Sequence, residues 1–233
     1  MTAKEQYTLA LQAARGLYQA QLYKGGKATH VHADVKPPQF LLFDRPATSD
    51  NTNSNDGDES STLDNLPIMQ INDFNRGKFL TRSIQTKNTC PFHMCNVHHK
   101  GSTYRAPEEL LRCSDDDESV AAQDDTIDVY SLGGVFFYLL SDGKKPYYHI
   151  GSYDKAAKLI LSGEKPRLPD VTKEYSSYDD EIVEMVKRRS KHPLFIALKG
   201  IMIKCWAFKP SDRPSSFEVV QMLEEKWNEI EFS

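Results

Sequence analysis

Three polar side chains in the segment His30–Leu42 could carry chemistry on a phosphate group. Phosphoryl transfer needs a carboxylate near the attacking hydroxyl, a cation at the transferring phosphate and oxygen ligands for magnesium. Asp34, Lys36 and Gln39 supply these three groups within six residues, between an expected helix and an expected strand. The sequence therefore offers one short segment with the residue types that phosphoryl transfer requires.

A second carboxylate follows later in the chain, where Asp73 lies in the segment 71–75, directly after an expected strand. Magnesium prefers carboxylate and amide oxygens together with phosphate oxygens. Gln39 and Asp73 are therefore candidate magnesium ligands. Because the two segments occur together and in this order, a plain turn residue is the less favoured interpretation of Asp73.

These two segments resemble the catalytic loop, His-Arg-Asp-Leu-Lys-Pro-x-Asn, and the Asp-Phe-Gly motif of eukaryotic-type protein kinases. Three later segments keep the order of that family. Residues 104–108 (Tyr-Arg-Ala-Pro-Glu) resemble the end of the activation segment, and residues 128–133 (Asp-Val-Tyr-Ser-Leu-Gly) resemble the start of the central buried helix. Residues 205–214 (Cys-Trp-x3-Pro-x2-Arg-Pro) resemble the last motif, so the resemblance spans essentially the whole chain apart from two acidic insertions.

The resemblance implies an α+β fold, predominantly α-helical, that corresponds to the C-terminal lobe of the protein-kinase fold with a small catalytic-loop β-hairpin, over residues 1–233. These residues contain no glycine-rich loop, strand lysine or helix glutamate of the kind that the N-terminal lobe supplies. We therefore expect that lobe to be missing and an apolar surface to be exposed in its place. The alternatives are a fragment of a longer kinase, a chain completed by a partner, and a degenerate relative.

The resemblance also implies a role for each candidate residue. Asp34 would accept the proton of the substrate hydroxyl, Lys36 would bind the γ-phosphate of ATP, and Gln39 and Asp73 would hold the nucleotide's Mg²⁺. The expected cofactors are thus ATP and Mg²⁺, and the expected substrate is a protein. A lysine two positions after Asp34 is typical of the serine/threonine class, and residues 101–103 (Gly-Ser-Thr) favour the same class more weakly.

Two further roles implied by the resemblance are structural. Glu108 would pair with Arg213, and Asp128 would brace the backbone of the catalytic loop. If the Glu108–Arg213 pair is buried, removal of one partner should cost about 3–5 kcal/mol.

Three positions depart from the family pattern. Ala33 stands where the family has arginine, which implies that control by activation-loop phosphorylation is lost. Gln39 replaces asparagine and offers the same amide oxygen on a longer stem. Asn75 replaces glycine, and asparagine tolerates left-handed backbone better than most residues. With the missing lobe, these departures motivate the alternative function, a catalytically impaired pseudokinase-like binding or scaffold module.

Apolar periodicity predicts the elements that must position these residues. Helices are expected over residues 4–23, 127–141, 153–161, 179–189, 193–206 and 215–227, and strands over residues 40–43 and 66–71. Residues 44–65 are rich in Ser, Thr, Asn, Asp and Gly and nearly lack apolar side chains, so we expect a disordered acidic insertion. A second acidic patch, residues 114–118, is expected to be a solvated loop.

The composition of the chain argues against several classes of function. The net charge of −4 argues against a nucleic-acid binder, which usually has a basic face. We see no signal peptide and no apolar run long enough to cross a membrane. The four cysteines show no disulfide framework, which favours a reducing compartment. The expected location is the cytoplasm, with the nucleus as the alternative.

One cluster has metal-ligand chemistry without a recognisable spacing. Thiolate and imidazole groups suit zinc. Five such residues lie within ten positions: Cys90, His93, Cys95, His98 and His99. Because the spacing matches no zinc motif, a solvated or substrate-facing loop is the favoured interpretation.

Overall fold

The computed structural model describes residues 1–44, 66–86, 90, 92, 102–111, 123–168 and 180–232. This part of the chain is mostly helical with two small two-stranded sheets, which confirms the predicted α+β class with predominant helix. The kinase-like architecture remains a prediction. The expected insertion at 44–65, except residue 44, lies outside the described residues, as do the acidic patch at 114–118 and His93, Cys95, His98 and His99.

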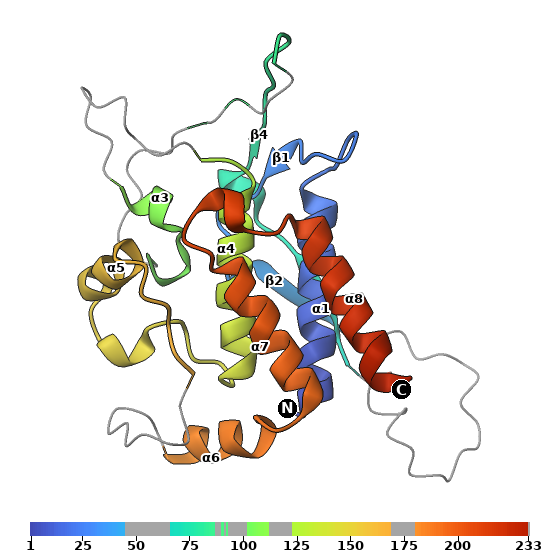
Figure 1. The fold of residues 1–233 in the computed structure, drawn as a ribbon, viewed down its shortest axis with the longest axis vertical. Coiled ribbons are helices and arrows are strands. Elements are labelled where there is room, and N and C mark those ends of the chain that lie inside the picture. The colour runs from blue at the N-terminus through green and yellow to red at the C-terminus, as the bar shows by residue number, and fades with distance from the viewer. Residues whose placement is uncertain are drawn as a thin grey trace.

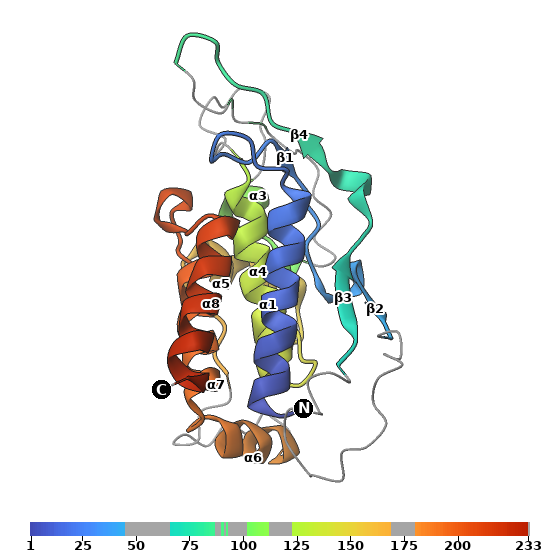
Figure 2. The same ribbon diagram turned by 90° about the vertical axis from the view of Figure 1, so that its right-hand side faces the viewer.

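The α-helices of the described residues are α1 (Ala3–Ala20), α3 (Pro107–Leu110), α4 (Thr126–Leu140), α5 (Tyr153–Leu161), α6 (Asp180–Arg189), α7 (Pro193–Cys205) and α8 (Ser216–Glu231). The strands are β1 (His30–Val31), β2 (Phe40–Phe43), β3 (Ile68–Ile71) and β4 (Lys78–Phe79). Short 3₁₀ turns are η1 (Pro37–Gln39), η2 (Phe74–Arg76), η3 (Ser102–Tyr104), η4 (Tyr148–Ile150) and η5 (Pro210–Asp212). Figures 1 and 2 show α1, α4, α7 and α8 as a bundle with the strands on one side. Within the described residues, none of the helices combines the length and hydropathy that a membrane span requires.

Helix α1 begins with a capping box, in which the Glu5 N–H donates to Thr2 Oγ1 (3.2 Å) and the Thr2 N–H donates to the Glu5 carboxylate (2.7 Å). The predicted end at residue 23 is wrong, because the helix ends at Ala20. Leu22 takes a left-handed φ of +47°, so the chain leaves the helix axis before the predicted end.

Helix α4 forms the centre of the core, as its apolar sequence predicts. It packs against α1 and α7, and most of its residues are buried. Two glycines permit close contacts on this helix. A Cβ on Gly133 would lie 2.8 Å from Trp206, and one on Gly134 would lie 2.6 Å from Tyr104. The glycines therefore let α4 approach both the end of α7 and the segment 102–111.

The other helices follow the predicted ranges closely. Helix α5 covers the predicted residues 153–161, and α6 and α7 differ from their predictions only at the ends. Helix α8 continues to Glu231, beyond the predicted end at residue 227. Ile230 in this extension packs against the core, which supplies the apolar contact that the prediction overlooked.

Two antiparallel strand pairs bring the candidate segments together. Strand β2 pairs with β3, so that Phe40 lies opposite Ile71, and β1 pairs with β4, so that His30 lies opposite Phe79. The expected returning strand, residues 66–71, is shortened to β3. Because each segment between the paired strands is anchored at both of its ends, residues 32–39 and 72–77 lie side by side.

Candidate active site

The backbone of the loop after β1 is held by a buried carboxylate on α4. Asp128 accepts the His32 N–H at Oδ2 and the Ala33 N–H at Oδ1, both at 2.7 Å, and Gln21 Nε2 adds a third bond at 3.2 Å. Burial raises the pKa of Asp128 to about 7, against the opposing effect of these bonds. The contacts confirm the predicted brace, and they fix Ala33 with a left-handed φ of +59°.

Asp34, the first candidate, projects from this braced loop into a cluster of donors. Lys36 Nζ lies 2.7 Å and Gln39 Nε2 lies 2.8 Å from Asp34 Oδ2. Arg105 Nη2 lies 2.6 Å from Asp34 Oδ1. The Asp34 side chain is 11% exposed, so it is largely buried. The structure therefore brings together the three candidates of the first segment.

The hydrogen-bond donors and cations around Asp34 determine the ionisation state of its carboxyl group. Burial by itself would raise the pKa of its carboxyl, but the hydrogen bond from Lys36 and the charge of Arg105 lower it. A further hydrogen bond from Gln39 acts in the same direction. Together they hold the pKa of Asp34 below its ordinary value, so the group is an ionised acceptor at neutral pH.

Gln39 is placed by the turn η1, in which its N–H donates to the Lys36 carbonyl at 2.9 Å. Its carbonyl accepts the Asn72 N–H at 2.7 Å, which fixes the turn against the second segment. The side chain is buried, and its amide nitrogen donates to Asp34. The amide oxygen is thus the atom that remains for a metal ion.

Asp73, the fourth candidate, is held in an uncommon backbone conformation with φ +62° and ψ +69°. Its Oδ1 is buried and has no hydrogen-bond partner among the described residues. A buried carboxylate oxygen without a donor is costly unless a cation compensates it. This orphaned oxygen, next to the Asn72 that pairs with Gln39, fits a hard cation such as Mg²⁺.

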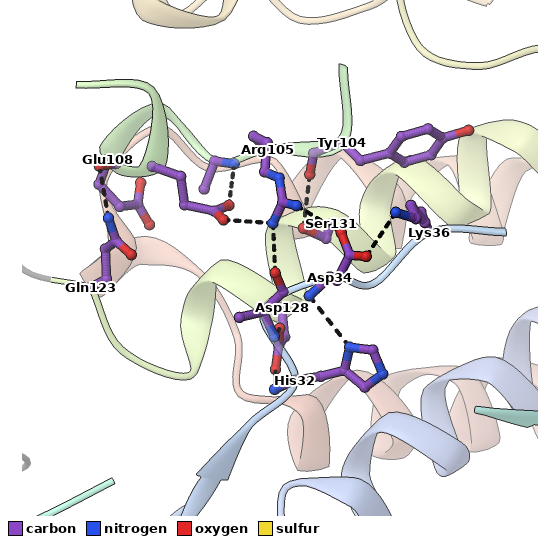
Figure 3. Close-up of polar contacts among 12 residues, drawn as sticks. His32, Asp34, Lys36, Tyr104, Arg105, Glu108, Gln123, Asp128 and Ser131 are labelled. Atoms are coloured by element: carbon purple, nitrogen blue, oxygen red, sulfur yellow. Dashed lines mark hydrogen bonds and ion pairs between the residues drawn. The ribbon is translucent and has the colours of Figure 1, made fainter. Parts of the chain in front are cut away.

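His32 links the two segments, a role that the sequence analysis did not assign. Its Nδ1 accepts the Asp34 N–H at 3.3 Å, so the proton lies on Nε2, which donates to the Asn72 carbonyl at 2.9 Å. Burial lowers the pKa of His32, and the ring is therefore neutral near pH 7. Figure 3 shows His32 beside Asp34 and Asp128.

Arg105 is the other residue that the sequence analysis missed. Its guanidinium donates to the Ala33 carbonyl at 2.6 Å and to Glu109 Oε1 at 3.0 Å, in addition to Asp34. Glu109 also accepts the Ala106 N–H at 2.8 Å, and burial raises the pKa of Glu109 to about 7 while Arg105 opposes this. Figure 3 shows Arg105 between its own segment and the loop that carries Asp34. A signal was present, because Arg105 directly precedes the Ala-Pro-Glu motif.

A second ion pair ties the same segment to the C-terminal helices. Arg213 donates to both oxygens of Glu108, at 2.5 and 2.8 Å, which confirms the predicted pairing. The two side chains are 0% and 3% exposed.

The described residues offer few side chains that could bind a metal ion. No group of three or more His, Cys, Asp or Glu side chains that could hold a metal ion by themselves occurs there. A magnesium ion at Asp73 would therefore take its other oxygens from the Gln39 amide, phosphate groups and water. Of the Cys/His cluster, only Cys90 lies within the described residues, as a free and partly buried thiol.

A scan against protein-family models found no match for this chain, and a search of the curated proteins found none either.

Proposed function

We propose that this chain carries the phosphotransfer site of a protein kinase, which moves the γ-phosphate of ATP to a protein hydroxyl, that of serine or threonine. The observation that carries the proposal is the juxtaposition of two carboxylates on neighbouring loops. Asp34 is ionised and surrounded by donors, whereas Asp73 presents a buried oxygen that lacks one. Asp34 can therefore accept a hydrogen bond from a hydroxyl, and Asp73 can bind a cation.

Asp34 has room for one more donor. An ionised carboxylate offers about four acceptor positions. Lys36 and Gln39 donate to Oδ2, and Arg105 donates to Oδ1. The remaining position, at Oδ1, would accept the substrate hydroxyl and orient it for attack. As the hydroxyl oxygen bonds to the γ-phosphorus, the bond to the β-phosphate oxygen breaks, ADP leaves and the proton passes to Asp34.

The nucleotide and its Mg²⁺ would be bound by Lys36, Gln39 and Asp73. The Lys36 ammonium is partly exposed beside Asp34, where it can meet a phosphate oxygen that approaches the same carboxylate. Gln39 and Asp73 would hold magnesium, which when bound neutralises charge on the phosphate oxygens. His32 joins the two loops, Asp128 braces the first of them, and both side chains are buried.

The second candidate function is a pseudokinase-like binding or scaffold module. One feature favours it: side chains of the chain itself occupy three of the about four acceptor positions of Asp34, and these contacts hold the loop in place. A module that only binds a partner would need the folded structure but not the phosphotransfer reaction. Nucleotide binding separates the two functions.

Thermal unfolding with ATP and Mg²⁺, against Mg²⁺ alone, tests nucleotide binding. A ligand that binds only the folded chain at a hundredfold excess over Kd adds about 2.7 kcal/mol of stability. We expect a rise in Tm for the wild type and none for Asp73→Ala. Asp180→Ala, an exposed carboxylate on α6, is the matched control and should keep the rise. A wild-type chain whose Tm is unchanged by ATP and Mg²⁺ would contradict the proposal.

A further inference from the structure

A large apolar groove lies beside the candidate active site. Its volume is about 780 Å³, within the range of small-molecule and peptide pockets. It is bordered by the start of α1, the strands β2 and β3, the second half of α4 and the loop that leads to α5. Apolar side chains from each of these elements line it, among them Leu9, Phe40, Met69, Val135 and Leu139. These walls could enclose an apolar side chain of a ligand.

One wall of the groove carries a buried polar group without a partner. Thr103 is 5% exposed, and its Oγ1 has no hydrogen-bond partner among the described residues. Such an atom is costly unless something bonds to it. Because Thr103 lines the groove, a rotation of its side chain would bring the hydroxyl within reach of a backbone N–H or carbonyl group of a ligand. Thr103 therefore indicates a polar ligand rather than a purely apolar one.

The charges at the groove have one sign. Lys36, Lys144 and Lys145 line it, and no aspartate or glutamate does so in the part of the chain that the structure describes. Lys145 is held on the wall, since its Nζ lies 3.0 Å from the Tyr153 hydroxyl and 4.5 Å from the centre of that ring. Lysines at the edge of an apolar groove complement carboxylates next to an apolar side chain.

The groove also adjoins the proposed acceptor of the hydroxyl proton. Lys36 lines the groove and reaches Asp34 Oδ2 at 2.7 Å. Thr103 lies two residues before Arg105, which contacts the other oxygen of Asp34. A polypeptide in the groove would thus lie directly beside the catalytic loop.

We propose that this groove docks the substrate polypeptide, as an extended segment in which an apolar side chain is flanked by acidic residues. The apolar side chain fills the groove, the carboxylates face Lys144 and Lys145, and the backbone bonds to Thr103. This inference rests on the proposed function, because it names the substrate class of that site. It goes beyond that function in giving the chain a preference for acidic, apolar sequences.

Fluorescence anisotropy tests the docking without nucleotide. The probe is a labelled peptide with one phenylalanine flanked by glutamates and one serine nearby. We expect it to bind, and we expect the double variant Lys144→Glu/Lys145→Glu to weaken binding about tenfold, since two attractive contacts become repulsive. The control, Lys199→Glu/Lys209→Glu, changes the net charge equally at exposed positions outside the groove and should bind as the wild type does.

Variants of the peptide test which of its side chains the groove recognises. A peptide with alanine in place of phenylalanine, and one with lysines in place of the glutamates, should each bind at least about tenfold more weakly. Thr103→Val should weaken the acidic peptide without altering its preference over the basic one. Equal binding of the acidic and basic peptides, or binding of a fatty-acid probe that the acidic peptide does not displace, would overturn the proposal.

Phosphate transfer to the same peptides separates the two claims. If phosphate reaches acidic and basic peptides equally well, the docking inference is wrong and the proposed function stands. If the acidic peptide binds as expected and receives no phosphate, the proposed function is wrong while the groove still selects acidic, apolar segments.

Discussion

Two arginine–carboxylate pairs anchor the segment 102–111, and they differ in exposure and in partners. Arg213 and Glu108 are 0% and 3% exposed, and three backbone carbonyls take further Arg213 donors, at 2.8, 3.0 and 3.3 Å. Arg105 and Asp34 are 10% and 11% exposed, and Asp34 keeps an acceptor position open. The same chemistry thus makes a sealed structural tie in one place and an orienting contact at the edge of a site in the other.

The two pairs show that the same polar groups can serve stability in one place and chemistry in another. In a fully buried pair, solvent cannot replace a lost partner. Removal of one partner therefore leaves the other charge buried without compensation, which lowers the stability of the fold. A pair that is partly exposed, such as Arg105 with Asp34, can exchange a contact for solvent or a ligand. Four predictions test this division.

Glu108→Ala should have the largest effect. It leaves the Arg213 guanidinium buried without its carboxylate, and we expect a loss of about 3–5 kcal/mol in the free energy of unfolding. Urea denaturation measures it. The double variant Glu108→Ala/Arg213→Leu should lose less than the sum of the two single variants. A loss below 1 kcal/mol for Glu108→Ala would mean that the pair is not a structural tie.

Arg105→Gln should cost less, about 2 kcal/mol, in the same measurement. It removes the charged partner of two carboxylates, but Glu109 can take up a proton because burial already raises its pKa to about 7. Arg15→Gln is the control, since the Arg15–Glu224 pair is about half exposed and should contribute less than about 1 kcal/mol. If Arg105→Gln destabilised the chain more than Glu108→Ala, the contrast between the two pairs would be reversed.

Asp73→Gly should stabilise the nucleotide-free chain by about 1 kcal/mol. It removes a carboxylate with an unpartnered buried oxygen and a side chain from a left-handed φ of +62°, which glycine tolerates. The same variant should lose the rise in Tm with ATP and Mg²⁺. A gain in stability together with a loss of binding is the signature of strain kept for function. A destabilised variant that still binds nucleotide would show that Asp73 is structural.

The smallest effect concerns the titration of Asp34. Its pKa in the folded chain is below the ordinary 3.8, so its contribution to stability is present above that pH and is lost as the pH falls through the folded value. Arg105→Gln should raise this pKa, because one of the opposing charges is gone. Carbon-13 NMR of the carboxyl group reads the shift. An unchanged pKa would show that Arg105 does not orient Asp34 by charge.

Local sequence predicted much of the fold, because the apolar residues that mark α1 and α4 are also the residues that these helices bury. The pairing of Glu108 with Arg213 and the brace by Asp128 came from the family resemblance, and the contacts confirm both. The end of α1 was predicted wrongly, because the turn at Leu22 depends on contacts that lie outside the helix. Local patterns therefore fix the elements more securely than their ends.

The site could be predicted only in part. Asp34, Lys36 and Gln39 are near neighbours in the sequence, so one short loop brings them together. Arg105 reaches Asp34 across 71 positions, and no periodicity marks such a contact. The orphaned oxygens of Asp73 and Thr103 are likewise invisible in the sequence, since burial without a partner is a property of the folded chain.

The most direct measurement is transfer of labelled γ-phosphate from ATP, with Mg²⁺, to the acidic serine peptide, by the wild type and by Asp34→Asn. The amide keeps the shape of the side chain but is a poor acceptor for the hydroxyl proton. We expect transfer by the wild type that falls by about 10²-fold or more in the variant. Equal transfer by both proteins, or no transfer by a wild type that binds ATP and Mg²⁺, would contradict the assignment of Asp34 as the catalytic acceptor.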